Sequence, residues 1–452
     1  MNVIHVIGAG LAGCEAAFQA AEAEADIVLY EMRPEKRTAA HKTDRFGELV
    51  CSNSLKTEQI HSAPWLLKQE LRQLGSLLMA AAERARVPGG HALAVDREIF
   101  SNEITRAIES HPRITIRRGE VTEIPDGIVI IATGPLTSDA LAKEISRLTG
   151  SERLYFYDSI SPIVAADSID MSIAFRASRY GKSLDGTDDY INCPFTRAEY
   201  EAFVSAVLSA GSYDAHIEED KISYFEGCLP LEELARRGHE TLRFGPMKPV
   251  GLTDPRTGRW PYAAVQLRQE NQRADSYNLV GFQNHMKFGD QARVFRIIPG
   301  LAQAEFVRFG QMHRNTYINS PALLASTLEL RSEPRIFFAG QICGVEGYAE
   351  SIATGLIAGR NAAALATGET LRRFPRETAL GSLCHYITSA DPRSFQPANI
   401  TFDLLPALDE GTKHRLRHDK KARHAEVCRR ASEAMEEFLY GSASRVCCEV
   451  SG

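Results

Sequence analysis

The sequence has no hydrophobic run near the roughly 20 residues that a membrane-spanning helix needs, so we expect no membrane partner. Its 9 cysteines show neither metal-ligand spacing nor a disulfide framework, and we therefore expect no metal site. No signal peptide is evident, because a buried strand is expected from residue 3 onward. Together these absences predict a cytoplasmic protein whose thiols stay free.

Excess positive charge is also lacking. The 452 residues carry a formal net charge of -6, which argues against a generally basic nucleic-acid-binding surface but permits a local basic face. Neither an internal repeat nor a low-complexity segment is evident. The length predicts two or three domains with a large core.

What the sequence does contain is a glycine-rich segment directly after its first apolar run. Residues 3–7 predict a buried strand that leads into the turn Gly8, Ala9, Gly10, Leu11, Ala12 and Gly13, followed by helix-forming residues. In such a segment, the glycines allow a tight turn, close approach to a pyrophosphate and packing of the helix on the strand. A second apolar run ends at Glu31, which is placed to accept both ribose hydroxyls of a nucleotide. We therefore predict a dinucleotide site.

Two later segments belong with this opening. Residues 127–135 predict a buried strand that ends in a turn containing Thr133 and Gly134. About two hundred residues later, an apolar run reaches Gly340, and the turn Glu346, Gly347 and Tyr348 leads into a helix of small residues. The N-terminus of that helix provides a second positive helix end for a cofactor. The three segments, in this order, resemble the two-dinucleotide-binding flavoproteins, which implies FAD rather than NAD as the tightly held cofactor.

The predicted fold is therefore α/β, a Rossmann-like FAD-binding fold with an inserted α+β domain. The alternation of strands and helices loosens in the middle of the chain, which indicates the insertion. We predict residues 1–157 and 279–410 as the two parts of the FAD-binding domain, 158–278 as the insertion, and 411–452 as a basic C-terminal helix and tail. Residues 413–423 fit either a solvated helix face or a contact with RNA phosphates.

Two cysteines lie in contexts that differ from those of the others. Cys51 is surrounded by small polar residues shortly after the second strand, and Cys228 lies in a turn fixed by glycine and proline. A thiol near a helix start and basic side chains gains thiolate character, yet a structural role remains open for both cysteines. Asp96 and Arg97, at the start of another expected helix, are either a helix cap or neighbours of the cofactor.

A more specific resemblance rests on motifs inside and outside the dinucleotide-binding segments. From residue 1 to about residue 402, the sequence contains, in this order, GAGLAGCEAA, LYEMRP, ELVCSNSLK, ALAVDR, IATGPLTS, YFEGC, FGPMKPVGL, AVQLRQ, MHRNTYINSP, FFAGQ, GVEGYAES and HYIT. These segments resemble the folate- and FAD-dependent RNA (uracil-5-)-methyltransferases, the TrmFO family. The resemblance implies that the methyl carbon comes from 5,10-methylenetetrahydrofolate, is carried by FAD to carbon 5 of a uridine, and that NADH or NADPH re-reduces the flavin.

The same resemblance implies roles for individual residues. Cys228, in the YFEGC motif, is expected to add to carbon 6 of the uracil. Cys51, in the CSNS motif, is expected near the flavin, where it either removes the carbon 5 proton or holds a flavin-linked intermediate. For folate, the family places an imidazole over the pteridine, and His313 is our candidate, with Arg314 and Asn315 as polar neighbours and His285 as the alternative. Arg268, and less strongly Lys248 and Arg243, are candidates for the folate glutamate or RNA phosphate.

The expected substrate is the T-loop uridine of tRNA, and no obligate protein partner is predicted. Ribosomal RNA is the alternative substrate. A relative that attaches an aminomethyl-type group to wobble uridine has a much longer chain, which favours the methyltransferase for this sequence. A plain FAD oxidoreductase acting on a small molecule would need neither the CSNS nor the YFEGC thiol.

Overall fold

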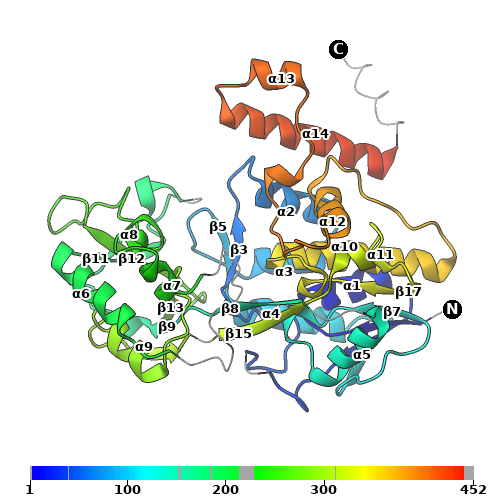
Figure 1. Ribbon diagram of the computed structural model, residues 1–452, viewed down its shortest axis with the longest axis horizontal. Helices are drawn as coiled ribbons and strands as arrows, with labels where there is room; N and C mark the ends of the chain where they lie inside the picture. Colours follow the sequence, from blue (N-terminus) through cyan, green and yellow to red (C-terminus); the bar gives the residue numbers. More distant parts are fainter. Residues whose placement is uncertain are drawn as a thin grey trace.

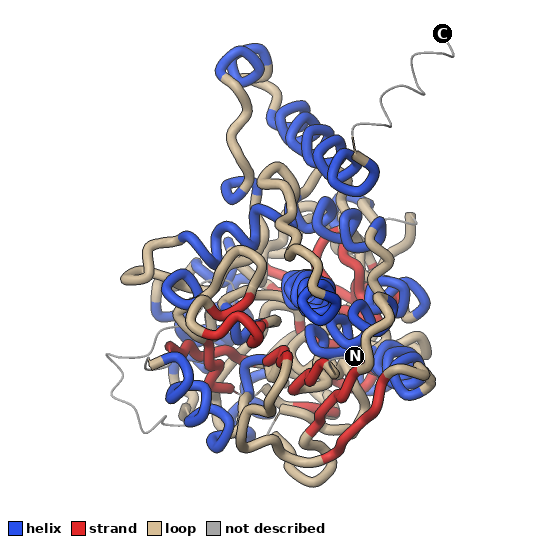
Figure 2. Tube along the Cα trace, turned by 90° about the vertical axis from the view of Figure 1, so that its right-hand side faces the viewer, coloured by secondary structure: helices blue, strands red, loops and turns tan. Residues whose placement is uncertain are grey.

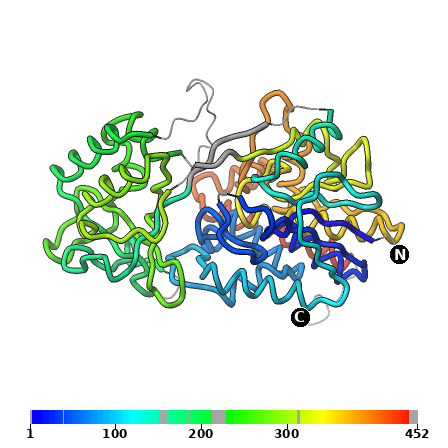
Figure 3. The backbone as a smooth tube through the Cα atoms, turned by 90° about the horizontal axis from the view of Figure 1, so that it is seen from below, coloured from blue at the N-terminus to red at the C-terminus, as the bar shows by residue number. Residues whose placement is uncertain are grey.

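A computed structural model describes residues 3–38, 40–150, 154–183, 186–212, 229–310 and 312–441, with only the backbone at residues 154–159 and 312–314. The chain forms two lobes that lie side by side, each with its own sheet and core (Figures 1 and 3). Within the described ranges, no helix combines the length and apolar character needed to cross a membrane.

The larger lobe is built on a six-stranded sheet. Its strand order is β16, β17, β7, β1, β2 and β6, and all neighbours are parallel except β16 and β17. The strands span Ile4–Ile7 (β1), Ile27–Glu31 (β2), Ile114–Arg118 (β6), Ile128–Ile131 (β7), Glu329–Leu330 (β16) and Glu333–Phe338 (β17). Continuous apolar runs such as β7 are buried on both faces, as a parallel sheet covered by helices requires. This confirms the predicted Rossmann-like α/β fold.

Two helices pack against each other closely beside this sheet, α1 (Leu11–Glu22) and α11 (Tyr348–Thr367). The approach depends on glycine, because a Cβ atom at Gly355 would lie 2.3 Å from the carbonyl oxygen of Ala12. Six further helices belong to this lobe: α2 (Ala63–Gln73), α3 (Leu77–Arg84), α4 (Arg97–Glu109), α5 (Asp139–Thr149), α10 (Ser320–Leu323) and α12 (Ala379–Ser389). A small antiparallel sheet also belongs to it, with β3 (Ser54–Thr57), β5 (Ala92–Val95) and β4 (Arg86–Val87) in that order.

The smaller lobe has an antiparallel sheet in the order β10, β11, β12, β13, β9 and β14. Its strands span Ile163–Ala165 (β9), Phe175–Arg176 (β10), Tyr190–Phe195 (β11), Ala263–Gln269 (β12), Ser276–Leu279 (β13) and Phe306–Arg308 (β14). Its helices are α6 (Arg197–Leu208), α7 (Leu231–Arg236), α8 (Thr241–Phe244) and α9 (Phe288–Phe295). Two further strands, β8 (Leu154–Ser159) and β15 (Met312–Tyr317), pair antiparallel at the junction of the lobes.

One predicted boundary needs correction. The sequence placed the return to the FAD-binding domain after residue 278, but α9 and β14 pack into the core of the smaller lobe. Phe282, Phe295 and Leu301 are fully buried in that core. The chain therefore leaves the smaller lobe after β14, because the apolar face of α9 needs the antiparallel sheet to cover it. The other domain limits stay predictions.

The C-terminal segment forms α13 (Glu410–Arg415) and α14 (Lys420–Tyr440), which stand at the top of the molecule (Figures 1 and 2). Helix α14 packs on α2 and buries Val427, Ala431 and Met435. The basic residues of the predicted segment are mostly exposed around the turn between α13 and α14. This exposure suits both interpretations of that segment.

Candidate active site

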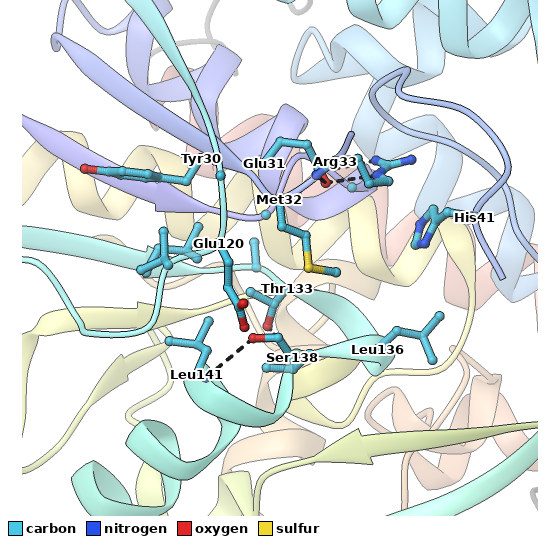
Figure 4. Close-up of a pocket in the computed structure, with 17 residues that line it drawn as sticks. Tyr30, Glu31, Met32, Arg33, His41, Glu120, Thr133, Leu136, Ser138 and Leu141 are labelled. Carbon is cyan, nitrogen blue, oxygen red and sulfur yellow. Dashed lines mark hydrogen bonds and ion pairs between the residues drawn. The ribbon is translucent and has the colours of Figure 1, made fainter. Parts of the chain in front are cut away.

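The glycine-rich turn between β1 and α1, where the sequence predicts a dinucleotide site, forms part of the wall of a cavity. Gly8 has φ +101°, a conformation that L side chains rarely adopt, and a Cβ atom there would lie 2.7 Å from the carbonyl oxygen of Ala132. At Gly13, a Cβ atom would lie only 1.7 Å from the carbonyl oxygen of Gly8. The turn, helix α1 and the end of β7 therefore meet through backbone contacts that exclude side chains. Gly8, Gly10, Glu31 and Thr133 line the cavity (Figure 4).

Glu31 lies in this cavity with both carboxylate oxygens engaged. The backbone N–H of Ala9 donates to Oε2 at 3.2 Å, and Arg33 donates through its backbone N–H and its side chain at 2.9–3.1 Å. Burial alone would raise the pKa of Glu31, but the hydrogen bonds and charge of Arg33 outweigh it and lower the pKa. The carboxylate is therefore ionised and fixed, which suits it to accept ribose hydroxyls. The sequence analysis did not identify Arg33.

A second cavity lies between the two lobes and shares Leu136 with the first. The larger lobe contributes Cys51, Lys56, Glu346, Gly347 and Tyr348, among others, and the smaller lobe contributes residues of β12, β13 and the segment that follows. Helix α11 begins at this cavity, with Gly347 as its N-cap. Its positive N-terminus favours negative charge there. The two cavities therefore adjoin at Leu136.

The loop that carries Cys51 is held through its backbone. The N–H of Cys51 donates to the Tyr348 hydroxyl at 2.9 Å, and that hydroxyl donates to the carbonyl of Ser52 at 3.0 Å. Arg97 donates from Nη2 to the carbonyl of Cys51 at 2.9 Å and pairs with Glu270 of the smaller lobe at 2.6 Å. Burial alone would lower the pKa of Arg97, but the Glu270 carboxylate outweighs it and raises the pKa. Both lobes thus fix the position of Cys51.

Asn53 of the same loop bridges the lobes a second time. Its fully buried amide donates to the carbonyls of Val95 and Gln269 at 3.1 and 2.9 Å. Its side-chain oxygen accepts from Nε of Arg268 at 3.0 Å. The CSNS motif is therefore a junction between the lobes as well as the carrier of a thiol.

The comparisons with known proteins agree with this geometry. A family model described as Glucose inhibited division protein A matches residues 3–370. A methylenetetrahydrofolate–tRNA-(uracil-5-)-methyltransferase TrmFO of Solibacter usitatus is 67% identical over 438 residues, which are 97% of this chain and 98% of that protein. The TrmFO of Koribacter versatilis is 62% identical over 442 residues, with the same coverage. The chain belongs to the TrmFO family.

A solved structure shares the fold of this TrmFO-family chain. Aquifex aeolicus GidA, in its form II crystal, matches with a TM-score of 0.69 and 16% identity, over 96% of this chain and 73% of that chain. At this identity the likeness shows the fold alone. It supports the arrangement of a parallel sheet with an inserted second lobe.

The cofactor residues predicted for this TrmFO-family chain divide into three groups. The first cavity is lined by Gly8, Gly10, Glu31 and Thr133, and the second by Glu346, Gly347 and Tyr348. The remaining six form the turns and the helix start beside the cavities without lining them: Ala9, Leu11, Ala12, Gly13, Gly134 and Gly340. Gly340 has φ +82°, and a Cβ atom there would lie 2.9 Å from that of Ala12. Asp96 caps α4, which confirms the cap interpretation.

The predicted substrate residues are described only in part. Asn315 and Arg268 line the second cavity, and both are buried. Cys228 and the side chains of His313 and Arg314 lie outside the described residues. The alternative, His285, is buried with its backbone N–H on Glu232 and is not among the residues lining this cavity. Arg243 and Lys248 do not line it either.

Three arginines surround Cys51 electrostatically, and the sequence analysis did not identify one of them, Arg308. The guanidinium groups of Arg97, Arg268 and Arg308 all lie within electrostatic reach of it. Arg97 is paired with Glu270, whereas Nε and Nη2 of Arg308 are buried without a hydrogen-bond partner among the described residues. Burial and the charge of Arg97 lower the pKa of Arg308. Positive charge near a thiol favours its thiolate form.

Arg308→Gln is expected to slow alkylation of Cys51 roughly tenfold at neutral pH, because one positive charge beside the thiolate is removed. Iodoacetamide labelling, quantified at the Cys51 peptide by mass spectrometry across a pH series, measures this effect. Arg308→Lys keeps the charge and should retain most of the rate. Equal rates and pH profiles in all three proteins would show that Arg308 does not set the charge state of Cys51.

Proposed function

We propose that this chain methylates carbon 5 of a uridine in tRNA, with FAD as its flavin, 5,10-methylenetetrahydrofolate as carbon donor and NADH or NADPH as reductant. The T-loop uridine is the proposed position, and the cytoplasm the proposed location. The names of relatives at 67% and 62% identity support tRNA as substrate and folate as donor. The observation that carries the proposal is a cysteine, Cys51, fixed at the second cavity beside the N-terminus of α11.

The residues present fit FAD. The backbone cradle at Gly8 and Gly13 excludes any Cβ atom, and Glu31 is ionised at the end of β2. The first cavity suits the adenosine part, and the second suits a flat ring that approaches α11. When bound, the flavin supplies the carrier position for the one-carbon unit and the hydride that completes the methyl group.

The chain's own residues supply the activation of uracil. The Cys228 thiolate is proposed to form a bond to carbon 6, and the electron pair of the 5,6 double bond moves toward the carbon 4 carbonyl. Carbon 5 then attacks the one-carbon unit. Cys51 is proposed to accept the proton that leaves carbon 5 as the one-carbon unit separates from its carrier. Once the hydride has completed the methyl group, departure of the Cys228 sulfur from carbon 6 restores the double bond. His313, Arg314, Asn315 and Arg268 are proposed to bind folate and RNA.

The function is tested by incubating the purified protein with methylenetetrahydrofolate, NADPH or NADH and unmodified tRNA, with ribosomal RNA in parallel. We expect 5-methyluridine in tRNA, detected by mass spectrometry of nucleosides. Cys228→Ala should form no product while the protein retains its yellow flavin, because only the bond to carbon 6 is lost.

Other outcomes are equally decisive. Product in ribosomal RNA alone would replace tRNA with the alternative substrate. A reducible flavin without methylation of either RNA would favour a plain flavin oxidoreductase. Full activity of Cys228→Ala would refute the proposed nucleophile.

A further inference from the structure

Lys56 has an unusual conformation at the wall of the second cavity. It lies on β3 with φ +63°, a left-handed backbone that is strained for a residue other than glycine. Its ammonium donates to Oε1 of Glu350 at 2.7 Å, to Oδ1 of Asn399 at 2.5 Å and to the carbonyl of Glu346 at 3.4 Å. A backbone strain and three hydrogen bonds thus fix one ammonium group. Such strain is concentrated at functional sites.

The two members of the ion pair between Lys56 and Glu350 lie at different depths from the second cavity. Lys56 lines the second cavity and its side chain is 31% exposed, whereas the Glu350 side chain is fully buried and does not line the cavity. The positive member of the pair therefore lies nearer the cavity and the negative member behind it. Oε2 of Glu350 is buried without a hydrogen-bond partner among the described residues. Oε1 accepts from the Lys56 ammonium at 2.7 Å and from the backbone N–H of Ile400 at 3.1 Å, so the carboxylate that holds the ammonium is itself fixed.

The first turn of α11 has no room for another side chain at this point. A Cβ atom at Gly347 would lie 2.3 Å from Oε2 of Glu350 and 2.6 Å from Nζ of Lys56. The ammonium is therefore packed directly against the N-cap of a 20-residue helix, whose N-terminus carries partial positive charge. Two sources of positive potential coincide at one end of the cavity. The Glu350 carboxylate beside them offsets part of this positive potential, and a negative group in the cavity would be stabilised by the remainder.

We propose that Lys56 is a positioning residue that favours the reduced, anionic form of the isoalloxazine ring and so raises the reduction potential of the bound flavin. The inference rests on the proposed function only in taking FAD as the occupant of the second cavity. Uptake of two electrons and one proton converts the neutral oxidised ring into an anion at neutral pH. A fixed positive charge stabilises that product and has little effect on the oxidised ring.

Other charged groups lie at or near the same cavity, and the role of Lys56 has to be compared with theirs. Glu346 lines it and accepts from the amide of Gln341, and Arg268 lines it from the smaller lobe. Arg97 lies behind the Cys51 loop, with its charge paired by Glu270. Lys56 differs from both arginines because its backbone is left-handed and its ammonium lies against the N-cap of α11.

The test is the midpoint potential of the bound flavin, measured by anaerobic dye-coupled reduction of the purified holoprotein without RNA, folate or NAD(P)H. Lys56→Gln is expected to shift the potential about 30 mV or more in the negative direction, which corresponds to a tenfold loss of preference for the reduced ring. Lys56→Arg should stay close to the unmodified protein. Glu350→Gln should shift the potential in the positive direction, because the ammonium loses its counter-charge.

The opposite signs separate this proposal from a structural role. A Lys56→Gln protein that retains FAD at an unchanged potential would overturn it, and so would a Glu350→Gln shift in the negative direction. If Lys56→Gln does not retain FAD, the proposal is tested by Glu350→Gln alone: a positive shift of the midpoint potential supports it and a negative shift overturns it. Absence of flavin from the unmodified protein would instead contradict the proposed function.

Discussion

Cys51→Ala is expected to lower methylation at least a hundredfold and to leave FAD bound. A side chain that accepts a proton in the rate-determining step contributes roughly 10²–10⁴-fold, and Cys51 lies on the wall of the cavity where that step is proposed. The backbone N–H of Cys51 donates to the Tyr348 hydroxyl, and the backbone carbonyl accepts from Arg97. Alanine preserves both hydrogen bonds, so the loop should stay in place. Single-turnover formation of 5-methyluridine measures the loss of methylation, and flavin absorbance recorded on the same sample measures the retention of FAD.

The matched control is Cys193→Ala. Cys193 is fully buried in the smaller lobe, where burial raises the pKa of its thiol to about 12, so it has no thiolate to contribute at neutral pH. Its replacement should leave the single-turnover rate within a few-fold of the original. A Cys51→Ala protein as active as this control would remove Cys51 from the mechanism.

Gly13→Ala is expected to prevent FAD binding and to lower the free energy of unfolding by about 2 kcal/mol or more. The added Cβ atom would lie 1.7 Å from a backbone carbonyl oxygen of Gly8, so helix α1 has to move away from β1 rather than a side chain turning aside. That movement displaces the helix N-terminus from the position of the pyrophosphate. Urea unfolding of the apoprotein and titration with FAD measure the two effects separately.

Gly10→Ala is the control within the same turn. A Cβ atom at Gly10 meets nothing within 4 Å, and its φ is -78°, so alanine should leave the unfolding free energy nearly unchanged. FAD affinity should still fall, because Gly10 lines the first cavity where the ligand approaches the backbone. Equal loss of stability in the two variants would contradict the contact-based explanation.

Much of the larger lobe follows from local sequence. The turn at Gly8, the acid at Glu31 and the later helix of small residues can each be recognised from the residues next to them in the sequence. In the structure they lie around two adjoining cavities. The thiol at Cys51 was also identified from its motif. These features are predictable because their physical causes lie within a few residues of one another.

The contacts that fix Cys51 were not predictable in this way. Arg97, Tyr348 and Arg268 contact or face residues 51–53 from positions about 45 to 300 residues away. A single sequence gives no record of such pairings, and a buried arginine looks the same in sequence as an exposed one. The misplaced boundary at residue 278 has the same origin, because the apolar face of α9 does not reveal which sheet covers it.

The pairing of β7 with β17 also has a consequence for the order of events during synthesis. Ile131 and Phe338 are partners in adjacent strands, so the six-stranded sheet remains incomplete until about two hundred further residues have left the ribosome. The smaller lobe between them has its own core and can form first on the nascent chain. The larger lobe, whose first strands are synthesised first, therefore completes its sheet only after the smaller lobe has been synthesised. We expect newly made protein to acquire FAD only after the end of α11 has emerged.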